Sequence, residues 1–241
     1  MTPPAHFGLF SLSDSVSFQD CLKIASSVQA QITSDWTPIW GRTGTITAYA
    51  QESDVPVHVW KVIVQDDIGQ PGALGYHTDE LNQPVAYVAS QGGDINQVCK
   101  TVSHEVLETI GDPFGNRLIP ALSPHDNKTP VRILCEVCDP SEDRDYQKHG
   151  LTVSDFYTPE FFDPTATHGQ KYSFLGALHG PRQILAGGYI TWVDAQGQFW
   201  QLTSFDGSSP KLEGPFNWQL TDGKSVREMV DEMTTPRKNA K

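Results

Sequence analysis

One segment of the 241-residue chain constrains its structure more than any other, because it carries helix boundaries and a row of possible ligands. Residues 96–110 have the apolar spacing of an amphipathic helix, and Asp94 or Asn96 is suited to begin it. Gly111 suits the left-handed position after the last turn, and Pro113 prevents continuation. We therefore predict a central helix from about Asn96 to Ile110. Its apolar side consists of Val98, Val102, Val106, Leu107 and Ile110.

This helix would present a histidine and a glutamate on one face. His104 and Glu108 are four positions apart, so their side chains point the same way, one turn apart. Glu105 is rotated about 100° from His104 and can still reach a water molecule beside an ion held there. We predict a metal site with His104 and Glu108 as ligands and Glu105 as the general base. The alternative interpretation is a solvated helix face with one i, i+4 pair.

The spacing departs in one position from the His-Glu-x-x-His signature of zinc hydrolases, because Glu108 stands where that signature has its second histidine. A carboxylate is a harder ligand than imidazole and adds negative charge to the site. We therefore expect one divalent metal, zinc first, while calcium or manganese is compatible with the same donors.

A metal held by two helix residues needs a third ligand from elsewhere. Glu136 is the first choice, because a carboxylate distant in sequence would close the coordination from another segment. Asp139, Asp112 and His77 are the alternatives, and the sequence leaves all of them open.

The residues from Ser103 to Pro113 resemble the active-site helix of zincin-type metallopeptidases. They are also similar to a group of uncharacterised bacterial and phage proteins with a His-Glu-x-x-Glu helix. That group shares matches to Trp40-Gly41, Gly75-Tyr76-His77, Glu136-Val137-Cys138-Asp139-Pro140 and Val153-Ser154-Asp155-Phe156. The resemblance implies a twisted sheet packed on the site helix, with a second helix below it.

The rest of the chain favours an α+β fold with a zincin-like mixed sheet and a β-rich C-terminal segment. The expected domains are a metal-site domain over residues 1–165, a β-rich extension over 166–233 and a flexible tail over 234–241. The other expected elements are a helix over 18–32, strands over 45–50, 57–64, 84–89 and 133–138, a hairpin turning at Gly150, paired strands over 187–192 and 198–202, and a short helix over 225–233.

Composition narrows the classes of function. A formal net charge of −12 disfavours nucleic acid as a partner. The N-terminus lacks the basic and apolar regions of a signal peptide, and no apolar run approaches a membrane span. We therefore expect a soluble protein, cytoplasmic or virion-associated, with no membrane partner. Cys135 and Cys138 would point to opposite faces of a strand, so we expect free thiols.

Three functional hypotheses follow. The first is a metal-dependent hydrolase, metallopeptidase-like, acting on a peptide or protein, with Tyr189 or His77 stabilising the oxyanion. The second is a non-catalytic zincin-like scaffold, such as a phage structural or binding protein, with a structural metal or none. The third is a structural domain without metal.

Overall fold

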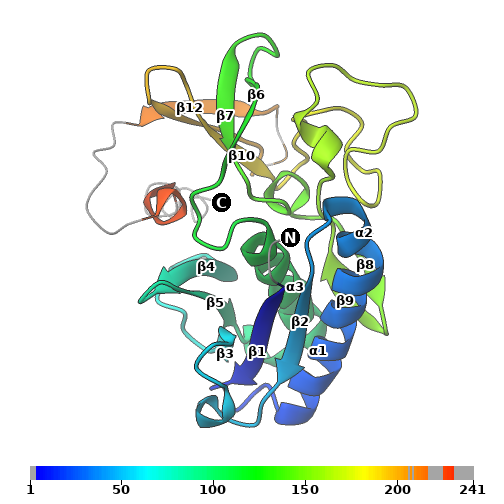
Figure 1. Ribbon diagram of the computed structural model, residues 1–241, viewed down its shortest axis with the longest axis vertical. Helices are drawn as coiled ribbons and strands as arrows, with labels where there is room; N and C mark the ends of the chain where they lie inside the picture. The colour runs from blue at the N-terminus through cyan, green and yellow to red at the C-terminus, as the bar shows by residue number, and fades with distance from the viewer. Residues whose placement is uncertain (1–3, 206, 208, 217–224, 231–241) are drawn as a thin grey trace. The chain divides into compact units, whose positions relative to one another are not determined.

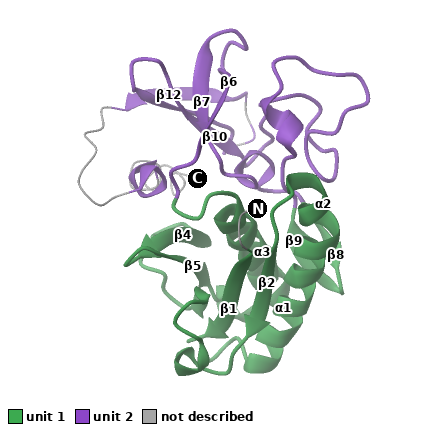
Figure 2. Ribbon diagram, viewed as in Figure 1, with its two compact units in different colours: residues 1–114, 145–154 green, residues 115–144, 155–241 purple. Residues whose placement is uncertain are grey.

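The computed structural model describes residues 4–205, 207, 209–216 and 225–230 (Figure 1). The chain divides into two compact units, which Figure 2 distinguishes by colour. The first comprises residues 1–114 and 145–154, and the second comprises residues 115–144 and 155–241. Each unit contains one five-stranded sheet. The chain is therefore an α+β protein with a mixed sheet and helices in its first half and an antiparallel sheet in its later half.

The first unit is built on a mixed sheet in the order β2-β1-β3-β5-β4. β1, β2, β3 and β5 run parallel, and β4 pairs antiparallel with β5 at one edge. The central strands carry consecutive buried residues, Phe7 to Phe10 in β1 and Val62 to Val64 in β3. The bounds are β1 Ala5–Ser11, β2 Gly44–Ala48, β3 Trp60–Gln65, β4 Gly75–Glu80 and β5 Gln83–Ala89.

Two helices pack on this sheet and on each other. α1 (Phe18–Gln31) begins with a capping box formed by Ser17 and Asp20 and contacts β1 and β2. α3 (Ile95–Gly111) begins at Asp94, whose carboxylate accepts the N–H groups of the first turn, and it contacts β3, β4 and β5. A π-helical turn, η1 (Ile32–Trp36), and α2 (Thr37–Trp40) continue α1.

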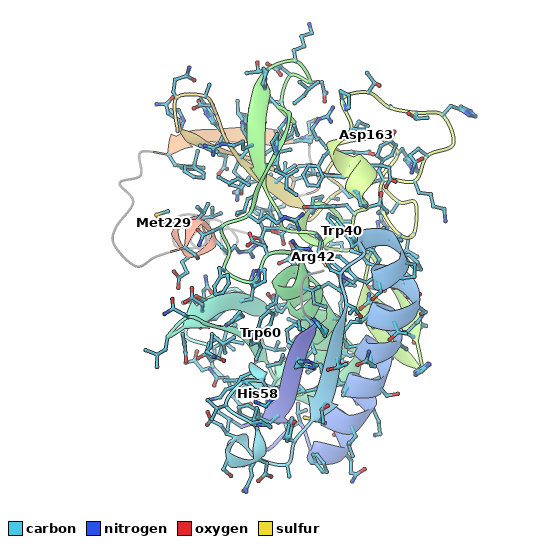
Figure 3. All side chains as sticks on the ribbon, in the orientation of Figure 1. Trp40, Arg42, His58, Trp60, Asp163 and Met229 are labelled. Atoms are coloured by element: carbon cyan, nitrogen blue, oxygen red, sulfur yellow. The ribbon has the colours of Figure 1, made fainter. Side chains whose placement is uncertain are left out.

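Arg42, labelled in Figure 3, fixes the C-terminal end of α3. Its Nη1 donates to the carbonyl oxygens of Ile110 and Gly111 at 3.1 and 3.0 Å. These carbonyls have no partner within the helix, and a cation is favoured beside them. The helix that carries the candidate ligands is therefore capped at both ends.

A hairpin from later in the chain completes the first unit. β8 (Asp145–Lys148) and β9 (Leu151–Ser154) turn at His149 and Gly150, which both have positive φ. The hairpin packs on α3 and α1, and the Ser154 N–H donates to Ser103 Oγ at 2.8 Å. Because of this packing, residues 145–154 belong to the first unit although residues 115–144 before them belong to the second. The domains expected from the sequence are consecutive and divide at residue 165.

The second unit is built on an antiparallel sheet in the order β12-β11-β10-β7-β6. Residues 226–230 are helical and supply Val226, Met229 and Val230 to its apolar core. The strands are β6 Leu118–Leu122, β7 Pro130–Leu134, β10 Tyr189–Val193, β11 Phe199–Thr203 and β12 Lys211–Phe216. Short 3-10 helices, η2 Glu52–Asp54, η3 Gln91–Gly93, η4 Asp139–Ser141 and η5 Pro159–Phe162, occupy loops of the two units.

Several sequence expectations are confirmed. The two long helices, the hairpin at Gly150 and the pairing of β10 with β11 are present. All four cysteines are buried and outside any disulfide, and burial raises the pKa of the Cys21 thiol to about 11 and that of Cys99 to about 12. Among the described residues, no helix combines the length and apolar character needed to cross a bilayer.

Two local expectations are wrong. Gly111 does not adopt the left-handed conformation, because the helix continues through it and ends at Asp112, whose N–H donates to Glu108 O. The strand expected over 133–138 ends at Leu134, where the Glu136 N–H turns back to the Leu134 carbonyl. The tail over 234–241 and the last residues of the C-terminal helix lie outside the described residues.

Gly188 is required by a close backbone approach, and its replacement by alanine should destabilise the second unit. A Cβ atom there would lie 2.6 Å from the Pro140 carbonyl oxygen and 2.8 Å from that of Asp139. We expect Gly188→Ala to cost about 1–3 kcal/mol in urea unfolding, the usual scale of overpacking. Gly180→Ala is the matched control, because nothing lies within 4 Å of its Cβ position. Equal stability of the two variants would contradict this account.

Asp155 should make the stability of the second unit depend on pH. The side chain is fully buried, Oδ1 accepts the Leu175 N–H at 3.0 Å, and burial raises the pKa of the carboxyl. Its stabilising contribution is therefore complete below the unfolded-state pKa of about 4 and is lost as pH rises through the folded-state value.

Asp155→Asn keeps an oxygen acceptor and removes the titration. Urea unfolding of both proteins between pH 4 and 7 should show the wild type losing stability relative to the variant as pH rises. A difference that stays constant, or that changes in favour of the wild type, would show that Asp155 does not titrate in this way.

Candidate metal centre

Helix α3 brings His104 and Glu108 together on its buried side. His104 Nε2 lies 3.4 Å from Glu108 Oε1, at the i, i+4 spacing expected from the sequence. Glu108 is fully buried and His104 is 9% exposed. The solvated helix face, the alternative interpretation of this spacing, is therefore not what the structure contains.

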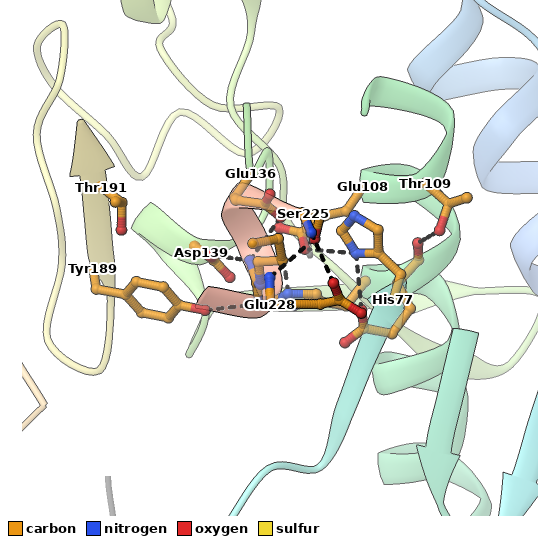
Figure 4. A network of polar contacts seen from close by, with 12 residues as sticks. His77, Glu108, Thr109, Glu136, Asp139, Tyr189, Thr191, Ser225 and Glu228 are labelled. Atoms are coloured by element: carbon orange, nitrogen blue, oxygen red, sulfur yellow. Dashed lines mark hydrogen bonds and ion pairs between the residues drawn. The ribbon is translucent and has the colours of Figure 1, made fainter. Parts of the chain in front are cut away.

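Edge strand β4 adds a second imidazole to the same carboxylate. His77 Nδ1 lies 3.8 Å from Glu108 Oε2 and 3.4 Å from Glu105 Oε2. His77 is itself 1% exposed and faces α3 across the sheet surface (Figure 4). Glu108 thus has an imidazole beside each of its two oxygens.

A glycine on the same strand makes room for Glu105. A Cβ atom on Gly75 would lie 2.7 Å from Glu105 Oε1 and 2.6 Å from Thr101 Cγ2, so only glycine leaves the carboxylate its place against β4. Glu105 is 3% exposed, and its Oε2 makes no hydrogen bond with the described residues. Thr109 Oγ1 donates to the Glu105 backbone carbonyl at 2.6 Å (Figure 4), which orders this turn of the helix.

The separations between these atoms suit ligands around an ion better than partners in hydrogen bonds. A hydrogen bond between nitrogen and oxygen is usually about 2.7–3.2 Å long. Two ligand atoms bound at about 2.1 Å with tetrahedral angles lie about 3.4 Å apart. The distances of 3.4 Å from His104 to Glu108 and from His77 to Glu105 match this spacing, and the 3.8 Å from His77 to Glu108 is longer.

The charge of these side chains also favours a bound ion. A buried carboxylate that is ionised needs a positively charged partner, and a divalent cation beside the imidazoles is one that these donors suit. His77, His104 and Glu108 of the first unit are among the histidine and carboxylate side chains that could hold a metal ion.

Glu136 and Asp139 belong to the second unit, where an arginine accompanies both (Figure 4). Arg227 Nη1 lies 2.7 Å from Glu136 Oε2 and 3.0 Å from Asp139 Oδ2. Its Nη2 donates to Tyr189 Oη at 3.0 Å. All four side chains are buried, and the guanidinium accounts for the burial of the two carboxylates.

The ligand roles expected for Glu136, Asp139 and Asp112 stay predictions. Glu136 lies in a turn after β7 rather than on a strand, and Asp112 is the C-cap of α3. Tyr189, expected as a possible oxyanion donor, is hydrogen-bonded to Arg227.

Two residues beside the candidate ligands, Gly75 and Arg227, were given no role from the sequence. Gly75 lies on the same face of the strand as His77, and its lack of a side chain leaves space for Glu105. Arg227 lies in Ser225-Val-Arg-Glu228, and Ser225 and Glu228 form a capping box. A single arginine among Val226, Met229 and Val230 indicates a buried cation that needs an acidic partner.

No family model, curated protein or solved structure matches this chain. The function of the chain is therefore inferred from the chemistry of its side chains.

Replacing Arg227 tests the ion-paired cluster of the second unit. Arg227→Met removes the cation and leaves Glu136 and Asp139 buried without it, so we expect a loss of about 3–5 kcal/mol in chemical unfolding. Adding Glu136→Gln and Asp139→Asn to that variant should restore part of the loss. If Arg227→Met is as stable as the wild type, the cluster does not stabilise the unit.

Proposed function

We propose that this chain is a metal-dependent hydrolase whose ion is held by His104 and Glu108, with Glu105 as the general base. The observation that carries the proposal is the 3.4 Å approach of His104 Nε2 to Glu108 Oε1 on a buried face of α3, next to Glu105. Zinc is the first candidate, and manganese or calcium fits the same donors.

Each residue has a distinct part in this chemistry. A bound divalent cation would supply the charge that acidifies water and polarises a carbonyl oxygen. His104 and Glu108 fix its position from consecutive turns of one rigid helix. Glu105 accepts the proton of the attacking water, and Gly75 leaves the space that its carboxylate occupies beside His77.

We propose further that the substrate is a peptide or protein and that the first unit is zincin-like. A mixed sheet with an antiparallel edge strand, packed on a helix with a His-Glu-x-x-Glu segment and on a second helix, supports this. The resemblance of the segment to zincin-type metallopeptidases supplies the substrate class.

Glu105→Gln separates catalysis from metal binding. The amide keeps the size of the side chain but cannot accept the proton, so activity on a peptide library should fall by about 100-fold or more. Metal content and melting temperature should stay close to those of the wild type. Glu52→Gln, an exposed carboxylate paired with Lys61 on the surface, is the matched control and should change neither.

His104→Ala should instead lose the ion that His104 and Glu108 hold, and stability with it, because metal binding is coupled to folding. Glu136→Gln, measured for metal affinity in the same way, tests the third ligand expected from the sequence. A wild-type protein that binds metal, cleaves no peptide in the library and behaves like Glu105→Gln would overturn the hydrolase and favour a scaffold with a structural metal.

A further inference from the structure

We propose that Glu108 is a bridging ligand between two divalent cations, one beside His104 and the other beside His77. This inference rests on the metal site of the proposed function and adds a second ion to it. All of its residues belong to the first unit, on α3 and β4.

The two oxygens of Glu108 have separate imidazole neighbours. Oε1 lies 3.4 Å from His104 Nε2, and Oε2 lies 3.8 Å from His77 Nδ1. With bonds of about 2.1 Å, these separations correspond to ligand angles of about 110° and about 130° at the two ions. Each oxygen can therefore share one ion with the imidazole beside it.

A carboxylate used in this way holds two ions at the spacing of known two-metal sites. Such sites have ions about 3.5–4 Å apart, clamped between shared ligands. Glu108 is suited to bridge two ions because it is fully buried on a capped helix, so bulk water does not hydrate its oxygens.

Glu105 lies beside the His77 position. Its Oε2 is 3.4 Å from His77 Nδ1, makes no hydrogen bond with the described residues and belongs to a side chain that is 97% buried, since 3% is exposed. The carboxylate can thus accept a proton from water at the second ion, which makes the base role of Glu105 compatible with two ions. Gly75 leaves the space that this arrangement needs.

Metal stoichiometry tests the inference directly. The full chain is stripped with chelator, dialysed against Mn²⁺ or Zn²⁺ alone, and measured by elemental analysis. We expect two ions per wild-type chain, one in His77→Ala, one in His104→Ala and none in Glu108→Ala. His58→Ala, an exposed histidine labelled in Figure 3, should keep two. Circular dichroism confirms folding, and His77→Gln serves if His77→Ala does not fold.

Electron paramagnetic resonance of the Mn²⁺ protein gives a second readout that does not depend on activity. Two ions bridged by Glu108 should give an exchange-coupled signal, which His77→Ala converts to the six-line spectrum of an isolated ion.

The outcomes distinguish the two proposals. One ion per wild-type chain, with an uncoupled spectrum, overturns the bridge and leaves the proposed function intact. One ion that is lost in His77→Ala and His104→Ala alike means that a single ion is shared, which also overturns the bridge. Absence of any bound ion in the wild type overturns both proposals.

Discussion

The first unit depends on how it accommodates two glutamates inside its core. Glu105 and Glu108 are side chains of a helix that packs against a sheet, in positions where apolar residues would be the simpler solution. Burying an ionised carboxylate without a partner is costly, so two of them beside two imidazoles favour a compensating positive charge. A bound metal ion would supply that charge, which is the role proposed for this cluster.

The surrounding structure holds this cluster rigidly. Asp94 caps the start of α3, Arg42 caps its end, and the β8–β9 hairpin covers its outer side through the hydrogen bond between Ser154 and Ser103. Ligands that project from a capped helix and from a paired strand lose little conformational freedom when an ion binds. In the second unit, Arg227 accompanies Glu136 and Asp139 within one buried network of charges.

The elements that could be predicted from the sequence are those in which one local signal dominates. The periodic apolar residues and polar caps of α1 and α3 define those helices, and the spacing of His104 and Glu108 defines the face they share. The elements that differ from the prediction are those in which tertiary contacts outweigh local propensity. Gly111 stays helical, and Arg42 donates a hydrogen bond to its carbonyl oxygen. The chain after β7 turns at Glu136, whose N–H donates to the Leu134 carbonyl. The nearness of His77 to Glu108 depends on the antiparallel pairing of β4, a non-local contact that a short Gly-Tyr-His segment does not reveal.

The passage of the chain through the two units has a consequence for biosynthesis. Helix α3 is complete once residue 111 has been made, yet the hairpin that covers it follows only after residues 115–144, which belong to the other unit. Until residue 154 leaves the ribosome, the apolar side of α3 and α1 that β9 covers stays open to solvent. The nascent chain therefore carries an uncovered surface while residues 115–144 are being made. Exposed hydrophobic surface of this kind is what chaperones bind and what leads newly made domains to aggregate.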